Sequence, residues 1–424
     1  MKRRIAPAVA LLAGLGRAWA SERFPKPEFS GGYRAPETVW PGSAPLAGEW
    51  LDVSVLALAL ALAAYLVLVR RSRRGVFWLT CFSLVYFGFV RQGCVCSVGS
   101  FQNVAEALFN PGVAVPASVL FFFALPLLAA LLFGRVFCAA VCPLGAIQEL
   151  VAWRPRRLPR WATECLGFIP RVLLGLAVLL AATGTAFIVC RKDPFVALFR
   201  LSGPLPVVLF GVGLLVLGVF VARPYCRFVC PYGVLLGWAS RLSWRRVTIT
   251  PDDCVVCGLC ESVCPVDAIL PATAERSSEA RPQGVRGLVL ALVVLPVLLG
   301  LGFWAGGALG KPLVRLHEDA LLLEQLAAED TGAQATVGTV AFRDGTRTRD
   351  QLGEDVARRR DRLARGGRWV GALLGLLAGL RLISLRIRWK RTGYEPDRAE
   401  CVACARCYSS CPRQRKWEKP NGGG

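Results

Sequence analysis

Histidine and methionine are almost absent from this sequence. Its 424 residues include one histidine, His317, and one methionine. A haem held by two histidines of this chain is therefore excluded, and so are zinc or copper sites built from several histidines. The Cys-x-x-Cys-His motif that attaches c-type haem does not occur either. Because the chain has 17 cysteines, thiolates must carry most of its redox or metal chemistry.

Acidic residues are also few. There are 29 Asp and Glu against 51 Lys and Arg, which gives a net charge of +22. Hydrophobic residues make up 54% of the chain, and the mean hydropathy is +0.47. A chain this apolar is neither disordered nor an ordinary soluble domain. Many of the basic residues follow apolar runs, as in membrane proteins, so nucleic-acid binding is not predicted.

The apolar runs predict a mainly α fold, a polytopic membrane helix bundle with about seven transmembrane helices. Each run approaches the ~20 residues that a helix needs to cross the hydrocarbon core. The last run is short and contains Arg381. Strongly basic junctions follow every second run, and these are expected to face the cytoplasm. The predicted spans lie near residues 50–70, 75–92, 113–133, 167–188, 204–222, 287–307 and 369–385.

The first twenty residues resemble a secretory signal peptide. Basic residues precede an apolar stretch, and Ala18-Trp19-Ala20 forms a small-x-small cleavage site. An uncleaved anchor is the alternative. We expect a multi-pass protein of the bacterial inner (cytoplasmic) membrane. The expected parts are a signal peptide (1–20), a periplasmic segment (21–49), a membrane core (50–250), a first ferredoxin half (251–285), a helix (286–307), a second periplasmic segment (308–367), a helix (368–386) and a second ferredoxin half (387–424).

Two cysteine runs share the spacing C-x2-C-x2-C-x3-C-P. In bacterial ferredoxins with this spacing, three thiolates bind one cubane and the fourth binds the other cluster. We therefore predict crossed ligation of two 4Fe-4S clusters by a ferredoxin-like domain that is split by a membrane excursion. Zinc could also bind four thiolates but rarely uses this spacing. Cluster 1 would take Cys254, Cys257, Cys260 and Cys411, and cluster 2 would take Cys401, Cys404, Cys407 and Cys264.

A second cysteine pattern repeats inside the predicted membrane core. Each copy has an Arg before the first Cys, then Cys-x3-Cys-Pro, and a Gly three residues after the second Cys. The four thiols could form a third metal centre, or they could be small packing residues. They are Cys138 and Cys142 in one copy, and Cys226 and Cys230 in the other. A degenerate copy with Cys94 and Cys96 falls on the predicted outer side.

Cys94, Cys96 and Cys190 form a separate outer group. An oxidising compartment would permit a disulfide among them, and a redox thiol pair or a metal site are the alternatives. Cys81 and Cys165 belong to no motif, so we expect them to pack in helices.

At these motifs the chain resembles the NosR/NapH-type membrane polyferredoxins and the related CcoG/RdxA proteins. The resemblance runs from about Phe77 to Pro265 and resumes at Cys401–Pro412. Such proteins pass electrons between the quinone pool or cytoplasmic donors and periplasmic enzymes, or reduce metals during enzyme assembly. NosR carries a large periplasmic flavin domain, where this sequence has only residues 21–49. A faint flavin-attachment pattern occurs at 330–336, but Gln334 stands where the flavin-bearing threonine would be expected, so flavin is not predicted.

The resemblance implies a membrane-bound iron–sulfur electron-transfer protein, such as a quinol dehydrogenase subunit that serves a periplasmic oxidoreductase. The alternative is an assembly factor that reduces a metal or thiols for a respiratory enzyme, and a redox sensor is a third reading. Arg227, Arg406 and Arg413 would stabilise reduced clusters or extend to the membrane interface. A quinone pocket is plausible, and Glu149 or Asp193 would then accept its protons. Leucines from Leu313 to Leu326 could dock a partner or pack internally.

Overall fold

The computed structural model describes residues 46–93, 97–153, 155–249, 254–273, 281–387, 391 and 393–412. The signal peptide, most of the segment 21–49, Cys94, Cys96 and Arg413 lie outside these residues. The elements of the first half are α2 (Leu46–Ala64), the π-helical turn η2 (Tyr65–Val69), α3 (Arg73–Ser83), the π-helical turn η3 (Leu84–Val90), α4 (Ser97–Phe109), α5 (Ala117–Phe133), the π-helical turn η4 (Phe137–Val141), α6 (Pro143–Val151), α7 (Arg160–Leu166), α8 (Ile169–Ala182), α9 (Ile188–Lys192) and α10 (Pro194–Phe199). The elements of the second half are α11 (Leu205–Phe220), α12 (Pro224–Phe228), α13 (Pro231–Arg241), α14 (Leu259–Ser262), β1 (Ile269–Leu270), α15 (Arg281–Gly310), the 3-10 turn η5 (Pro312–Leu316), α16 (Glu318–Asp330), α17 (Val337–Arg343), α18 (Arg349–Arg386), β2 (Glu395–Pro396) and α19 (Arg406–Ser410).

The fold is mainly helical, as predicted, and four described helices are long and apolar enough to cross a membrane. They cover Gly48–Val69, Trp161–Ala182, Val285–Gly310 and Arg349–Arg386. The predicted spans 113–133 and 204–222 correspond to the shorter apolar helices α5 and α11. The predicted span 75–92 is covered by α3 and η3. The total of seven transmembrane helices stays a prediction.

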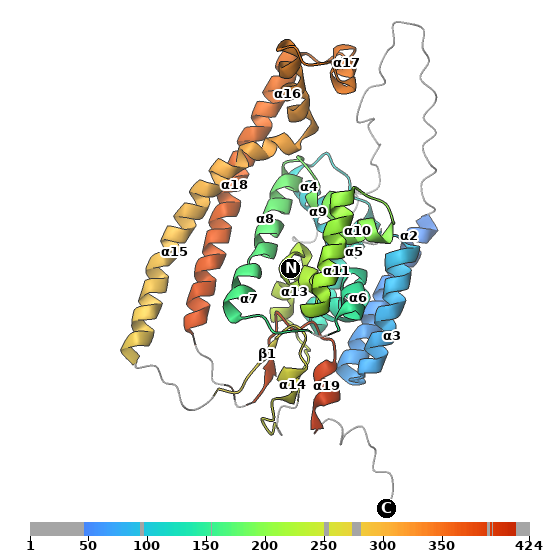
Figure 1. The fold of residues 1–424 in the computed structure, drawn as a ribbon, viewed down its shortest axis with the longest axis vertical. Helices are drawn as coiled ribbons and strands as arrows, with labels where there is room; N and C mark the ends of the chain where they lie inside the picture. The colour runs from blue at the N-terminus through green and yellow to red at the C-terminus, as the bar shows by residue number, and fades with distance from the viewer. Residues whose placement is uncertain are drawn as a thin grey trace, which may run out of the picture.

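The helices α15 and α18 form a long antiparallel hairpin beside the bundle (Figure 1). Glycines at four-residue spacing let the two backbones touch. A Cβ added at Gly306 would lie 2.0 Å from the carbonyl oxygen of Gly367, and one at Gly371 would lie 2.0 Å from that of Gly302. Small residues at such spacing are typical of closely packed membrane helices. At 38 residues, α18 is much longer than the predicted span 369–385.

The segment between α15 and α18 is helical and packs internally. Val314 and Ala320 are buried against Leu180 and Leu363, so part of the predicted leucine segment covers α8 and α18. Thr336 caps α17 in a capping box. Residues 331–336 therefore link α16 to α17.

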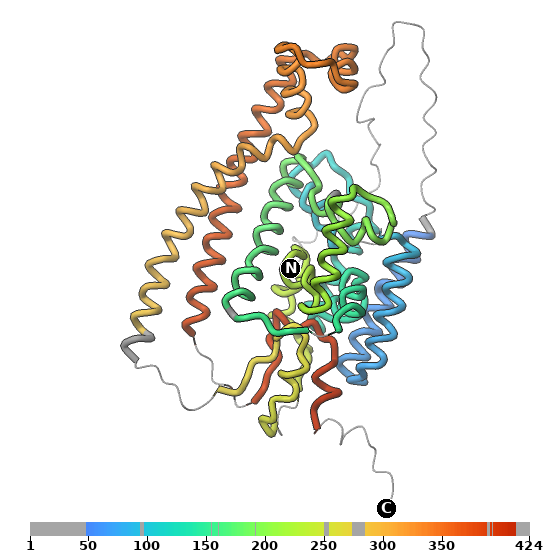
Figure 2. The backbone as a smooth tube through the Cα atoms, in the orientation of Figure 1, coloured from blue at the N-terminus to red at the C-terminus, as the bar shows by residue number. Residues whose placement is uncertain are grey.

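The two halves of the predicted ferredoxin domain meet at the opposite end of the molecule from α16 and α17 (Figure 1). The strands β1 and β2 pair antiparallel, with Ile269 opposite Pro396. The short helices α14 and α19 also pack together. Figure 2 shows segments 254–273 and 393–412 side by side, although the α15–α18 hairpin separates them in sequence.

Candidate metal centre

The two cysteine runs fold into loops of the same local conformation. Val256 and Ala403, which precede the second cysteine of each run, have φ values of 50° and 53°. Gly258 and Ala405, which follow that cysteine, have φ values of 75° and 62°. A left-handed backbone is unfavourable for L-residues and above all for a β-branched valine. Two runs with the same unusual backbone at the same positions indicate one repeated ligand loop.

The structure brings Cys264 to the second run. Burial raises the pKa of Cys407, and the neighbouring Cys404, Cys401 and Cys264 raise it further. Burial likewise raises the pKa of Cys401 to about 12, with Cys404 and Cys264 adding to the effect. Cys264 and Cys260 both lie in the first run, and both add to the raised pKa of Cys407, so the thiols of the two runs lie near one another. The amide of Ala268 donates to the Cys264 sulfur at 3.3 Å.

The predicted cluster 1 ligands of the first run lie in one loop. Burial raises the pKa of Cys260 to about 11, and Cys254 and Cys257 contribute to this shift. Cys411 is half-buried.

The described residues fit four-iron clusters by the chemistry of their donors. Buried thiolates repel one another, and iron would relieve this repulsion while amides donate to the sulfurs. Among the described residues, no three His, Cys, Asp or Glu side chains lie close enough to hold a single metal ion. Each thiolate of a cubane binds a different iron, so its ligands stand farther apart than those of one ion.

The four membrane-core cysteines line one small cavity. Cys138, Cys142, Cys226 and Cys230 share it with Tyr225 and Tyr232. Cys142 and Cys230 occupy corresponding positions: each is the N-cap of a helix whose first residue is proline. Gly145 and Gly233 each stand three residues after these cysteines, and a Cβ on Gly233 would lie 3.8 Å from the Cys230 sulfur. The repeat therefore builds two equivalent thiol-bearing helix starts that face each other.

Each copy of the repeat sends its arginine into the other copy. Arg223 donates to the carbonyl oxygen of Cys138, and a Cβ on Gly145 would lie 3.6 Å from its Nη1. Conversely, a Cβ on Gly233 would lie 3.2 Å from Nη2 of Arg135. Arg135 also lies 3.8 Å from the Cys138 sulfur and donates to the Ala399 carbonyl at 2.9 Å. The repeated Arg and Gly positions therefore hold the two copies together around the cavity.

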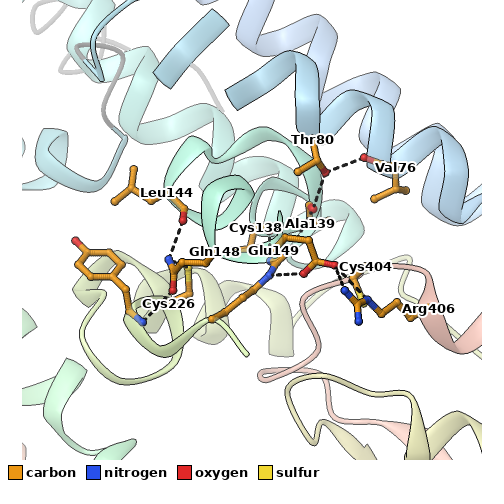
Figure 3. Close-up of polar contacts among 12 residues, drawn as sticks. Val76, Thr80, Cys138, Ala139, Leu144, Gln148, Glu149, Cys226, Cys404 and Arg406 are labelled. Carbon is orange, nitrogen blue, oxygen red and sulfur yellow. Dashed lines mark hydrogen bonds and ion pairs between the residues drawn. The ribbon is translucent and has the colours of Figure 1, made fainter. Parts of the chain in front are cut away.

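Glu149 connects the membrane core to the second ferredoxin half (Figure 3). Its carboxylate pairs with Arg73 at 2.6 Å, Arg223 at 3.1 Å and Arg406 at 2.5 Å. Burial alone would raise the pKa of Glu149, but Arg223, Arg406 and Arg73 outweigh burial and lower it to about 2. Glu149 is therefore not the proton acceptor that was predicted. Arg406 lies between two cysteines of the second run and is held by this carboxylate.

Gln148, next to Glu149 on α6, makes hydrogen bonds at the four-cysteine cavity. Its Nε2 donates to the Leu144 carbonyl at 2.7 Å and to the Cys226 sulfur at 3.4 Å, and its Oε1 accepts from the amide of Tyr225 at 3.0 Å. The sequence reasoning did not single out Gln148, although it recurs as Gln102 at the same offset from the second Cys of the degenerate copy.

The other predicted site residues are scattered. Cys190 is exposed on α9, and its predicted companions Cys94 and Cys96 lie outside the described residues. Cys81 is half-buried, but Cys165 is exposed and does not pack inside the protein as predicted. Arg227 is 10% exposed and pairs with Asp267 at 3.5 Å.

Comparisons with known proteins match these cysteine motifs. A 4Fe-4S binding domain matches residues 115–161 and 203–250, and a second 4Fe-4S binding domain matches residues 247–270. Protein NirI of Paracoccus denitrificans is 34% identical over 237 residues, which is 51% of this chain and 34% of NirI. The regulatory protein NosR of Pseudomonas aeruginosa is 30% identical over 48% of this chain and 30% of NosR. The ferredoxin-type protein NapH of Escherichia coli is 31% identical over 40% of this chain and 60% of NapH.

These matches cover less than two thirds of each of these three relatives, and no solved structure matches the chain. The chain is therefore an iron–sulfur protein with 4Fe-4S binding domains on a helical, membrane-type scaffold. These matches confirm the resemblance to the NosR/NapH-type 4Fe-4S membrane ferredoxins found in the sequence.

Proposed function

We propose that this protein passes electrons between the quinone pool or a cytoplasmic donor and a periplasmic oxidoreductase. The observation that supports the proposal is the meeting of the two cysteine runs, where β1 pairs with β2 and α14 packs against α19. A ferredoxin domain divided by a membrane hairpin requires this meeting, and separate structural zinc sites in each half do not. Four-iron clusters supply one-electron chemistry when bound.

The chain's own residues would hold and tune two such clusters. Cluster 1 takes Cys254, Cys257, Cys260 and Cys411, and cluster 2 takes Cys401, Cys404, Cys407 and Cys264. The cavity of Cys138, Cys142, Cys226 and Cys230 would hold a third centre. Buried arginines and amide donors to sulfur favour the more negative, reduced state of a cluster, because hydrogen bonds, net charge and burial set its potential.

Two buried arginines support a third centre next to cluster 2. The Arg223 side chain is fully buried, and Cys226, Cys404 and Cys138 are among the groups that raise its pKa. Arg135 touches Cys138 and also favours the thiolate of Cys401. Both arginines therefore lie between the two cysteine groups, as is expected of neighbours in a chain of redox centres.

A quinone would find a suitable cavity beside the third centre. Cys226 and Cys230 line a hollow together with Trp238, Arg171 and Pro170, beside the start of α8 and along α13. Its lining is partly apolar and partly hydrogen-bonding, as cofactor pockets commonly are. We assign the exchange of electrons with quinone to this hollow.

Cysteine variants of the full chain, purified anaerobically, test crossed ligation. Iron and acid-labile sulfide should reach about eight atoms each per chain for two clusters, or about twelve with a third. EPR after dithionite should show that Cys264→Ser alters the same cluster signal as Cys407→Ser, with Cys165→Ser as the exposed control. If Cys264→Ser instead matches Cys260→Ser, ligation is not crossed. Zinc without labile sulfide would refute the proposed function.

A further inference from the structure

A hollow lies where both ferredoxin halves meet the membrane core, at the end of the molecule that carries α14 and α19 (Figure 1). Its walls come from α3, the loop after α6, the first cysteine run and α19. Among its described lining residues, four are arginines and one, Asp267, has a carboxylate. We call it the arginine hollow, and its arginines are Arg73, Arg156, Arg157 and Arg406.

One carboxylate cannot neutralise the arginines on the α3 and α19 side of the hollow. Arg73 and Arg406 both pair with Glu149, at 2.6 and 2.5 Å (Figure 3). The same carboxylate also pairs with the buried Arg223 at 3.1 Å. Three guanidinium groups on one carboxylate leave a surplus of two positive charges. Arg73 and Arg406 line the hollow, whereas Glu149 lies buried behind them.

The opposite wall of the hollow also keeps a positive charge. Arg157 pairs with Glu261 at 3.1 Å and with Asp267 at 3.6 Å. Asp267 pairs in addition with Arg227 at 3.5 Å, so two carboxylates here face two arginines. Arg156 is exposed, and it forms no ion pair with any described residue. Its charge is therefore available to a bound group.

The hollow reaches the predicted cluster ligands directly. Cys264 is itself a lining residue, and in the proposed function it binds cluster 2. Ser410 also lines the hollow and immediately precedes Cys411, a proposed ligand of cluster 1. A group held in the arginine hollow therefore lies next to ligands of both predicted clusters.

The lining favours acidic groups of a protein surface over a small organic cofactor. Pockets for small organic molecules are mainly apolar and aromatic, but no aromatic residue is among the described lining residues of this hollow. Guanidinium groups form strong, oriented pairs with carboxylates. Electron-transfer partners typically meet over small surfaces, and complementary charges speed and orient their encounter. A basic hollow beside redox centres has the charge that an acidic electron carrier requires.

We propose that the arginine hollow docks the acidic face of a soluble electron-carrier protein. This inference rests on the proposed function, because the clusters are the acceptors of the carrier's electrons. Carboxylates of the carrier pair with Arg156 and with the surplus charge of Arg73 and Arg406. One electron then passes from the reduced carrier to an oxidised cluster, and no bond forms or breaks.

Stopped-flow reduction of the anaerobically purified full chain by an acidic flavodoxin in its hydroquinone state tests the docking. In an uncharged detergent, the second-order rate constant should fall at least about tenfold between about 20 and about 500 mM salt, because salt screens the attraction. Arg156→Glu should lower the rate constant at low salt by about three- to tenfold, since charges at the rim of an interface act mainly on association. The two rates should converge at high salt.

Arg245→Glu is the matched control. Arg245 is exposed like Arg156 but does not line the hollow. Each arginine is anchored in the same way: the amide of Arg156 donates to the Phe220 carbonyl at 2.7 Å, and that of Arg245 to the Leu132 carbonyl at 2.9 Å. Arg245→Glu should leave the rate constant within about twofold of the wild type, because its charge lies outside the docking surface.

Reduction by dithionite separates the docking from the proposed function. Clusters that dithionite reduces equally in all three proteins, but that flavodoxin reduces at a rate independent of salt and of Arg156, would overturn the docking and leave the function standing. A chain without acid-labile sulfide would refute the function itself. If Arg156→Glu lowers the phosphatidylglycerol that copurifies with the chain and does not change the flavodoxin rate, the hollow binds a lipid headgroup and the proposal is wrong.

Discussion

Replacing Glu149 by glutamine removes the one carboxylate that three arginines share. The Glu149 side chain is 1% exposed and that of Arg223 is 0% exposed, whereas Arg73 and Arg406 are 21% and 25% exposed. Glutamine keeps the size of the side chain but leaves Arg223 as a buried charge without a counter-ion. Removing one partner of a buried ion pair typically costs about 3–5 kcal/mol, because the other charge stays desolvated.

The lowered pKa of Glu149 corresponds to a free energy of similar size. The pKa falls from the usual 4.5 to about 2, and each pKa unit corresponds to about 1.36 kcal/mol. After the opposing effect of burial, the folded chain therefore stabilises the ionised carboxylate by a net of about 3 kcal/mol. We expect Glu149→Gln to lower the free energy of unfolding at pH 7 by about this amount.

Denaturant unfolding in detergent, followed by tryptophan fluorescence, would measure the loss. The control is Glu164→Gln, because Glu164 pairs with Arg381 at a similar 2.5 Å but is 37% exposed. Exposed pairs contribute about 1 kcal/mol or less. The reasoning fails if Glu149→Gln costs no more than Glu164→Gln.

The stability gained from Glu149 should also depend on pH. Because the folded pKa lies below the unfolded one, the stabilisation is complete above about pH 4.5 and is lost as the pH falls towards 2. The difference in stability between the wild type and Glu149→Gln should therefore be constant near neutral pH and shrink below about pH 4.5. A difference that persists at pH 2 would contradict the assignment.

Two glycine substitutions extend the predictions. Gly306→Leu should force α15 away from α18, because even a Cβ would lie 2.0 Å from a backbone oxygen. We expect the free energy of unfolding to fall by at least the ~1–3 kcal/mol of ordinary overpacking, and thermal unfolding would measure it. Gly300→Leu is the control, since nothing lies within 4 Å of its Cβ position, and an equal loss there would contradict the close packing. Gly233→Ala should displace Arg135 and reduce iron bound at the four-cysteine cavity without changing the ferredoxin EPR signals, whereas unchanged iron would show that this contact is not needed.

The cysteine pattern could be read from the sequence because ligand loops are local. Each run fixes its own loop, so Cys254–Cys264 and Cys401–Cys411 were recognisable without knowledge of the fold. The arginines that surround Glu149 come from positions 76, 74 and 257 residues away. No periodicity connects such positions, so their convergence appears only in the folded chain.

Helix lengths were less predictable for a related reason. Hydropathy marked only 369–385, because the preceding part of α18 is rich in charged residues. Those charges are partly paired, as in Arg358–Asp355 at 2.6 Å, and Arg359 donates to the Gly184 carbonyl at 2.7 Å. The helix therefore begins at Arg349, far outside the apolar stretch that made it visible.

The pairing of β1 with β2 has a consequence for the order of assembly. Residues 269–270 meet residues 395–396 only after the whole α15–α18 hairpin has been synthesised and folded back. Contacts between segments this far apart in sequence form late. The two ferredoxin halves therefore close last, so insertion of iron and sulfide into the second run should follow completion of the chain. A protein stalled before residue 395 would lack Cys401, Cys404, Cys407 and Cys411, so the predicted ligand sets of both clusters would be incomplete.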